Sequence, residues 1–250
     1  MPSISTTMVT GAASGIGQAI AIRAAQDGHR VACVDIRDQT DTLDRIQATN
    51  GKATVHACDL RDAEAVRKLF ADVEDSYGGP DILINSAGTL GSWPLSLTET
   101  TGDMFDEVFG VNVKGTYLCC RAALGAMRQR GHGSIVNIGS ELAFKAAPGA
   151  TLYCAAKAAV VQLSRALAVE EAQNGIRVNV VCPGPVDTAL LNPTVGPVPP
   201  DIKAQSFDQT AMQRLGTPEE IAEIVWFVAS DKASYMTGAV IPVDGGALAT

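Results

Sequence analysis

The sequence predicts a doubly wound α/β fold, in which a parallel seven-stranded sheet carries helices on both faces. Short runs rich in β-branched residues alternate with longer helical patterns along the whole chain. These runs are nearly continuous in apolar residues, as parallel strands covered on both faces require. No linker rich in proline, glycine or serine divides the chain, so we expect residues 1–250 to form a single domain.

The expected strands are short aliphatic runs, and the most apolar of them contain Ile-Leu-Ile and Val-Asn-Val-Val. In chain order they lie at 7–10, 30–35, 54–58, 82–85, 134–138, 177–181 and 239–243. The helical patterns fill the intervals, at 15–27, 40–48, 62–77, 103–130, 152–173 and 218–229. Residues 189–214 break this alternation with several prolines, and we expect them to form a lid over a binding site, because so long a connection is usually functional.

Composition excludes several classes of protein. With 250 residues, 46% hydrophobic and 18% charged, the chain can bury a sizeable core. A net charge of −8 argues against a nucleic-acid partner, which requires a basic surface. We expect no membrane span, since no run of 18 apolar residues exists, and no signal peptide, since residues 1–7 lack lysine, arginine and a long apolar stretch.

The cysteines and histidines predict neither disulfides nor a metal site. Six cysteines contain no C-x-x-C pair, and we interpret them as buried thiols in a reducing compartment, which predicts a cytoplasmic protein. Three histidines are scattered without the spacing of metal ligands, so no metal is expected.

A glycine-rich turn follows the first expected strand and leads directly into a helix. It reads Thr10-Gly-Ala-Ala-Ser-Gly-Ile-Gly17, and its glycines let the backbone approach a pyrophosphate held by the helix N-terminus. The second strand ends in Asp35, eighteen residues past Gly17, where a carboxylate accepts hydrogen bonds from the adenosine ribose and repels the 2′-phosphate of NADP. Arg37 could accommodate that phosphate, but the turn holds no basic residue, so we favour NAD over NADP.

Three further residues indicate proton-transfer chemistry. Tyr153 and Lys157 lie four apart on an expected helix and so share a face. We expect the ammonium to lower the pKa of the phenol, which would make it a usable proton donor or acceptor near neutrality. Ser140 lies thirteen positions upstream, just beyond a strand end, at the edge where such sheets bind ligands.

Taken in order, these motifs resemble the single-domain short-chain dehydrogenase/reductase family, whose members have about 250 residues. The resemblance covers nearly the whole chain and includes Asn-Ser-Ala-Gly at 85–88, Pro-Gly-Pro-Val-Asp-Thr at 183–188 and Asp-Gly-Gly at 244–246. The chain departs from the usual Asn-Asn-Ala-Gly by one amide. It also places the carboxylate of Glu141 directly after Ser140.

The resemblance implies a Rossmann-type dinucleotide-binding and catalytic domain with Tyr153 as the general acid/base. Lys157 would stabilise the phenolate and contact the nicotinamide ribose, Ser140 would hold the substrate oxygen, and Asn112 would anchor a water of a proton relay. Asp59 would receive the adenine amino group, and Thr188 the nicotinamide carboxamide. The implied cofactor-binding residues are Gly11, Ser14, Gly15, Ile16, Gly17, Asp35, Ile36, Asp59, Leu60, Asn85, Ala87, Gly88, Tyr153, Lys157, Pro183, Gly184, Val186 and Thr188.

The expected function is NAD-dependent interconversion of a small, largely neutral secondary alcohol, such as a polyol or sugar derivative, and its ketone. Its substrate would contact Ser140, Glu141, Leu142, Trp93, Tyr153 and Pro185. An NADPH-dependent ketone or 3-oxoacyl reductase remains an alternative, as does a non-catalytic nucleotide-sensing regulator on the same fold. Helices 103–130 and 152–173 are apolar on more than one side, and similar family members are usually homotetramers built through them.

Overall fold

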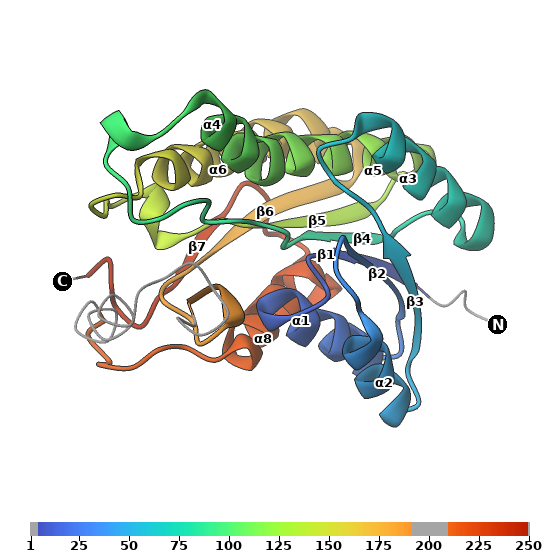
Figure 1. The fold of residues 1–250 in the computed structure, drawn as a ribbon. Helices are drawn as coiled ribbons and strands as arrows, with labels where there is room; N and C mark the ends of the chain where they lie inside the picture. Colours follow the sequence, from blue (N-terminus) through green and yellow to red (C-terminus); the bar gives the residue numbers. More distant parts are fainter. Residues whose placement is uncertain (1–4, 192–209, 250) are drawn as a thin grey trace.

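The computed structural model describes residues 5–191 and 210–249, and within them the chain forms a sheet between two layers of helices (Figure 1). All neighbouring strands are parallel, in the order β3-β2-β1-β4-β5-β6-β7. The strands are β1 (Thr6–Thr10), β2 (Arg30–Asp35), β3 (Lys52–Ala57), β4 (Ile82–Asn85), β5 (Gly133–Ile138), β6 (Ile176–Pro183) and β7 (Val240–Val243). This is the doubly wound, Rossmann-type fold that the alternation of patterns predicts.

One helical layer contains α1, α2 and α8, and the other contains α3, α4, α5 and α6 (Figure 1). Their bounds are α1 (Gly15–Gln26), α2 (Thr40–Ala48), α3 (Ala63–Tyr77), α4 (Gly102–Phe109), α5 (Thr116–Arg130), α6 (Thr151–Glu171) and α8 (Pro218–Ala229). The short 3₁₀ segments are η1 (Leu97–Glu99), η3 (Glu141–Ala143), η4 (Ala172–Asn174), η5 (Ala189–Leu191) and η6 (Asp231–Ala233). Strand bounds agree with the expected ones to within two residues, as do those of every expected helix but one.

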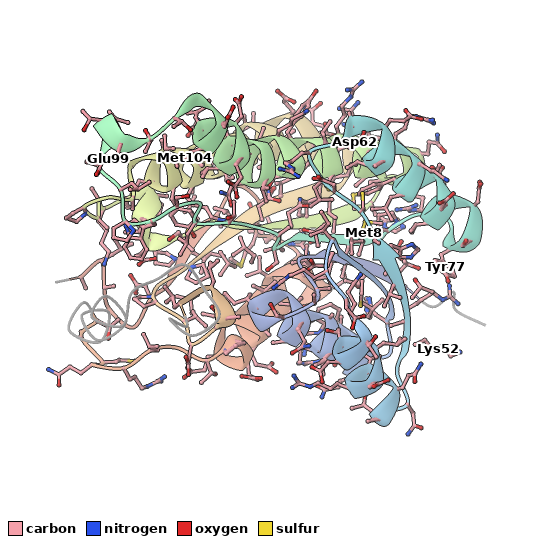
Figure 2. All side chains as sticks on the ribbon, in the orientation of Figure 1. Met8, Lys52, Asp62, Tyr77, Glu99 and Met104 are labelled. Carbon is pink, nitrogen blue, oxygen red and sulfur yellow. The ribbon has the colours of Figure 1, made fainter. Side chains whose placement is uncertain are left out.

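Each face of the sheet has its own apolar core. On one face Ile20 of α1 and Val225 of α8 pack with strand residues such as Val9, all fully or almost fully buried. On the other face Met8 and Leu83 pack against Met127 and other residues of α5 and α3. Met8 therefore lies in the interior, whereas Lys52 and Glu99 lie at the surface (Figure 2). Because successive strand residues alternate between faces, Met8 and Val9 serve opposite cores.

The expected helix 103–130 is interrupted, and on this point the sequence interpretation was wrong. Residues 110–115 form a π-helical segment, η2 (Gly110–Gly115), between α4 and α5. The side chain of Asn112 donates from Nδ2 to the carbonyl of Val108 at 3.0 Å, and that carbonyl is the one its own N–H would reach in an α-helix. Thr116 repeats the pattern from Oγ1 to the carbonyl of Asn112 at 2.8 Å. Side chains thus donate to carbonyls that backbone N–H groups would bind in a continuous α-helix.

Most of the expected lid at 189–214 cannot be compared with the structure. Residues 192–209 lie outside the described part of the chain, while η5 at the start of the lid is described.

Within the described ranges, one helical stretch, Thr151–Asn174, is long and apolar enough to cross a membrane. It carries buried residues such as Ala156 and Val160, and Val160 packs against β6. It therefore fits a core helix of the fold.

Candidate active site

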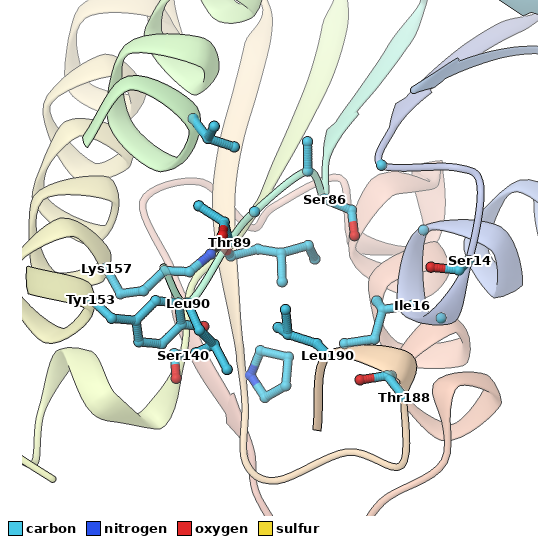
Figure 3. Close-up of a pocket in the computed structure, with 18 of the residues that line it drawn as sticks. Ser14, Ile16, Ser86, Thr89, Leu90, Ser140, Tyr153, Lys157, Thr188 and Leu190 are labelled. Atoms are coloured by element: carbon cyan, nitrogen blue, oxygen red, sulfur yellow. Dashed lines mark hydrogen bonds between the residues drawn. The ribbon is translucent and has the colours of Figure 1, made fainter. Parts of the chain in front are cut away.

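A cavity of about 550 Å³ opens at the carboxyl ends of β1, β2, β4, β5 and β6 (Figure 3). The loops that leave these strands supply its walls, as expected for a doubly wound sheet. Ser14 and Ile16 lie on one side, and Ser140, Tyr153 and Lys157 lie on the other (Figure 3). The cavity thus joins the glycine-rich turn to the catalytic candidates, although these segments are more than a hundred residues apart in the chain.

The glycine-rich turn forms one end of the cavity because its backbone folds back on itself. Gly11 has φ +71° and packs against the backbone of Ala87, where a β-carbon would come within 2.8 Å. A β-carbon on Gly17 would lie only 2.1 Å from the carbonyl oxygen of Gly11. Ser14, the N-cap residue of α1, makes no side-chain cap, and the first turn of α1 holds no acidic residue. The helix N-terminus therefore offers its N–H groups and its positive dipole end to an anion.

Asp35 fixes this turn against the end of β2. Its buried carboxylate accepts hydrogen bonds from the backbone N–H of Ala13 at 3.0 Å and of Arg37 at 3.0 Å. The guanidinium of Arg37 lies alongside, 3.0 Å from Ser14 Oγ and 3.4 Å from Asp35 Oδ1. A buried carboxylate and a largely exposed cation therefore share the part of the cavity beside the turn, which bears directly on cofactor choice.

Asp59 lies on the cavity wall but is already engaged. Arg61 binds its carboxylate through Nε at 3.0 Å and Nη2 at 2.6 Å. The hydrogen bond from the Arg61 side chain is the main reason that the pKa of Asp59 is lowered. A nucleobase amino group would share this carboxylate with Arg61. The sequence interpretation missed Arg61, although its position two residues after Asp59 was a usable signal.

Lys157 is a buried cation at the centre of the site. Its Nζ donates to the carbonyl of Ile138 at 2.9 Å and lies 5.6 Å from the centroid of the Tyr153 ring. Burial lowers the pKa of Lys157 to about 8, because the interior disfavours its charged form. The four-residue spacing predicted this shared helix face correctly.

The expected effect of Lys157 on Tyr153 is wrong for this structure. Burial raises the pKa of Tyr153 above its ordinary value of 10, and the negative charge of Glu141 adds to that rise, while a hydrogen bond with Ser140 opposes it. Lys157 is not among the causes of the shift. Desolvation of the phenol therefore has a larger effect on its pKa than the neighbouring ammonium. In the cofactor-free protein the phenol is protonated at neutral pH.

Glu141 lies inside the site rather than in solvent. Its carboxylate is buried, lines the cavity and accepts a hydrogen bond from Ser140 Oγ at 2.8 Å. Burial raises its pKa, and the Ser140 hydrogen bond and the charge of Lys145 oppose that rise. Ser140 Oγ also accepts the N–H of Leu142 at 3.1 Å, which caps η3 and holds the hydroxyl in place.

Two expected site residues do not line the cavity. Asn85 points into the core, where its Nδ2 donates to Asn137 Oδ1 at 2.8 Å and to Cys120 Sγ at 3.3 Å. Asn112 is buried behind the loop after β4, donating from Nδ2 to the carbonyl of Thr89 at 2.8 Å and accepting its N–H at 3.2 Å. Asn112 therefore holds the backbone of the loop after β4, whereas Asn85 joins a network of side chains in the core.

Every other expected site residue lines the cavity. The lining also includes residues that the sequence interpretation did not name as site residues, chiefly Thr89, Leu90, Glu107 and Val111. Leu90 packs with Tyr153, Trp93 and Leu142 in a small apolar cluster beside the phenol. No local motif marks these residues, because they are brought together by tertiary packing. In the described part of the chain, no group of three His, Cys, Asp or Glu side chains could hold a metal ion.

Known proteins resemble this chain over nearly its whole length. The family model described as enoyl-(acyl carrier protein) reductase matches residues 11–247. The 2-(R)-hydroxypropyl-CoM dehydrogenase of Xanthobacter autotrophicus is 36% identical over 244 residues, covering 95% of this chain and 96% of the relative. The meso-2,3-butanediol dehydrogenase of Serratia marcescens is 36% identical over 245 residues, covering 97% and 94%. A structure from Agrobacterium tumefaciens, described as a candidate 2-deoxy-D-gluconate 3-dehydrogenase with bound NADP, superposes with a TM-score of 0.89 at 33% identity, covering 100% of this chain and 98% of that one.

Proposed function

This chain belongs to the short-chain dehydrogenase/reductase family of oxidoreductases, and we propose that it interconverts a small, largely neutral secondary alcohol and its ketone with NAD(H). The single observation that carries the proposal is the shape of the cavity. One continuous space of about 550 Å³ connects the uncapped N-terminus of α1 to the hydroxyls of Ser140 and Tyr153. A dinucleotide that lay along it would bring a substrate oxygen to those hydroxyls.

The residues at the glycine-rich turn fit such a dinucleotide. The Gly11–Gly17 backbone allows close approach of a pyrophosphate, and Asp35, on the cavity wall beside the turn, would accept hydrogen bonds from the adenosine ribose. Thr188 lies on the same side of the cavity as the turn, with its methyl group against Gly15, and would receive the nicotinamide carboxamide. When bound, an oxidised nicotinamide supplies the hydride acceptor and a positive charge near the phenol.

The protein side of the reaction is the transfer of one proton at the substrate oxygen. Tyr153 is proposed as the general acid/base, because its phenol lies in the cavity with its hydroxyl beside Ser140. Ser140 would orient the substrate oxygen, and Lys157 would bind the nicotinamide ribose. Asn112 would act indirectly, by fixing the Thr89 backbone.

The test is Tyr153→Phe, with Tyr235→Phe as the matched control because Tyr235 is fully exposed outside the cavity. Removing a general acid/base typically lowers turnover about 10²–10⁴-fold, and we expect a loss in this range with NAD affinity retained. Turnover is measured as NAD reduction with a panel of alcohols, beginning with meso-2,3-butanediol. A Tyr153→Phe enzyme that kept turnover within about tenfold of the parent would contradict the proposed role.

The proposed substrate class rests on the cavity wall around Tyr153. Leu90, Trp93, Leu142 and Leu191 give this end an apolar lining. Lys157 is buried and already bound to a carbonyl, so it does not offer a site for a multiply anionic substrate. The butanediol dehydrogenase relative also supports a small neutral alcohol. A polyol or sugar derivative would add hydroxyl groups that Glu141 could bind.

One observation favours a second candidate, an NADPH-dependent ketone reductase. The Arg37 guanidinium is largely exposed and lies beside Ser14, where it could turn toward a 2′-phosphate. The NADP-bound relative is consistent with this reading. The ratio of the dissociation constants for NAD and NADP separates the two candidates. A protein that bound NADP more tightly than NAD would overturn the proposed preference.

We also propose a homotetramer in the cytoplasm, assembled through α4, α5 and α6. Phe105, Tyr117 and Val169 are exposed apolar residues on these helices, and Phe105 stacks on Phe109. Such faces are commonly covered by a second copy. The six cysteines are all free, which fits a reducing compartment. A mass near 26 kDa by light scattering would rule out the assembly.

A further inference from the structure

Glu141 is a buried carboxylate in direct contact with a proposed catalytic hydroxyl. It follows Ser140 in the chain, and 3₁₀ segment η3 turns its side chain back so that Oε2 lies 2.8 Å from Ser140 Oγ. The carboxylate is buried and lines the same cavity as Tyr153. No arginine or lysine donates a hydrogen bond to it among the described residues, so its principal partner is the serine.

The hydrogen-bonding capacity of one hydroxyl explains why this contact matters. Ser140 Oγ has one hydrogen and two lone pairs. The N–H of Leu142 takes one lone pair at 3.1 Å. An ionised Glu141 offers only acceptors, so the Ser140 hydrogen must point to it, as the structure has it. Ser140 then has no hydrogen to donate, and its second lone pair faces the hydroxyl of Tyr153. It cannot donate to a ketone oxygen, which is itself only an acceptor.

Protonation of Glu141 reverses this arrangement. When the Tyr153 hydroxyl donates to a bound ketone, it leaves the second lone pair of Ser140. The carboxylic acid of Glu141 then donates its own hydrogen to that lone pair, and the serine hydrogen becomes free. It can then point into the cavity toward the oxygen that gains negative charge during reduction. We propose that Glu141 is a positioning residue that sets, through its protonation state, whether Ser140 donates a hydrogen bond to the substrate oxygen. This inference rests on the proposed function of Ser140 and Tyr153.

Titratable and charged groups surround Glu141 on several sides. Tyr153 faces it from α6, Cys182 from β6, Lys145 from the loop after η3 and Asp244 from the segment after β7, while Lys157 lines the same cavity. Burial and the charge of Asp244 raise its pKa, whereas Ser140 and Lys145 lower it, and burial is the largest cause. The charge of Glu141 in turn raises the pKa of Tyr153. Ionisation of Glu141 therefore opposes both the serine donor and the phenolate.

The first test is the pH dependence of acetoin reduction by NADH in the parent and in Glu141→Gln. The parent should lose about tenfold or more in kcat as the pH rises through the Glu141 titration, because a donor to a developing oxyanion is withdrawn. The glutamine amide donates to Ser140 at every pH, so the variant should stay within about threefold over the same range. Glu170→Gln is the control, because this substitution removes the same charge from an exposed position on α6.

A second measurement does not depend on turnover. Carbon-13 NMR of glutamate side-chain carboxyls in the cofactor-free protein should show Glu141, assigned by Glu141→Gln, titrating at higher pH than the exposed glutamates. In Ser140→Ala that titration should move to still higher pH, because the serine hydrogen bond stabilises the carboxylate.

The outcomes separate this inference from the proposed function. A parent and a Glu141→Gln enzyme with the same pH profile would overturn the inference while leaving the reductase activity established. A Glu141 titration that coincides with the exposed glutamates, or that Ser140→Ala does not move, would also overturn it. If no alcohol or ketone of the panel turns over, the proposed function fails, and the NMR titration alone decides whether Glu141 and Ser140 are coupled.

Discussion

The ammonium of Lys157 donates a hydrogen bond of 2.9 Å to the main-chain carbonyl of Ile138, the last residue of β5. This bond ties the middle of α6 to the carboxyl end of the sheet and places a cation on the cavity wall. A buried cation with a neutral carbonyl partner is costly for the fold, because its hydration is only partly replaced. Buried charges of this kind are typical of functional sites, which supports a role for Lys157 in the proposed reaction.

Lys157→Met should therefore make the cofactor-free protein more stable and the enzyme worse. We expect a gain of about 1–3 kcal/mol in the free energy of unfolding, since a buried charge is replaced by an apolar chain of similar length. NAD affinity and turnover should both fall. Urea denaturation and NAD titration measure the two effects, and an unchanged NAD affinity would contradict the proposed ribose contact.

The stability gain of Lys157→Met should also depend on pH. The folded-state pKa of Lys157 is lowered to about 8 from 10.5. Below about pH 8 Lys157 keeps its proton in both the folded and the unfolded chain, so the full cost of burying its charge destabilises the parent. Between about pH 8 and pH 10.5 the unfolded chain binds more protons than the folded chain, so the parent gains stability as pH rises. The difference between variant and parent should shrink from pH 8 toward 10.5, and a constant difference would disprove this account.

Arg37→Ala should change cofactor preference rather than cofactor binding in general. The backbone contacts of Asp35 to Ala13 and Arg37 remain after the substitution, so NAD affinity should stay within about threefold. NADP affinity should fall about tenfold or more, because the cation nearest to a 2′-phosphate is lost. Fluorescence titration with each dinucleotide measures the ratio. Equal losses for both cofactors would show that Arg37 acts on the turn instead.

Asn85→Ala tests whether Asn85 supports the fold rather than the cofactor. The substitution leaves Asn137 Oδ1, a fully buried acceptor, without its 2.8 Å hydrogen bond. We expect a loss of about 1–3 kcal/mol in the free energy of unfolding, with NAD affinity of the folded protein changed little. Calorimetry and NAD titration below the transition provide the two values. A large loss of NAD affinity without a loss in the free energy of unfolding would show that Asn85 contributes to cofactor binding.

Gly17→Ala and Gly125→Ala form a matched pair with opposite outcomes. A β-carbon on Gly17 would lie 2.1 Å from the carbonyl oxygen of Gly11, so the turn must open and dinucleotide binding should be lost. A β-carbon on Gly125, in α5, meets nothing within 4 Å. There alanine should stabilise the helix by about 0.5–1 kcal/mol. Tight NAD binding by Gly17→Ala would show that the turn is not the pyrophosphate site.

Local sequence predicted those parts of the site that depend on short-range geometry. The glycine turn is determined by conformations that only glycine adopts without strain, and the shared face of Tyr153 and Lys157 follows from helical periodicity. The position of Asp35 at the carboxyl end of β2 follows from the strand pattern. The wrongly continuous helix 103–130 shows the limit of periodicity, because the side chain of Asn112 competes for backbone carbonyls that no pattern of apolar residues records.

By itself, then, the sequence determined the order of strands and helices, the doubly wound fold class and most of the residues that line the cavity. The tertiary structure alone decided that Asn85 points into the core, that Arg61 engages Asp59, and that Glu141 is buried against Ser140. It also decided the direction of the Tyr153 pKa shift. The physical reason is that desolvation and hydrogen-bond direction depend on atoms from distant segments, whereas periodicity and turn conformation depend on neighbours in the chain.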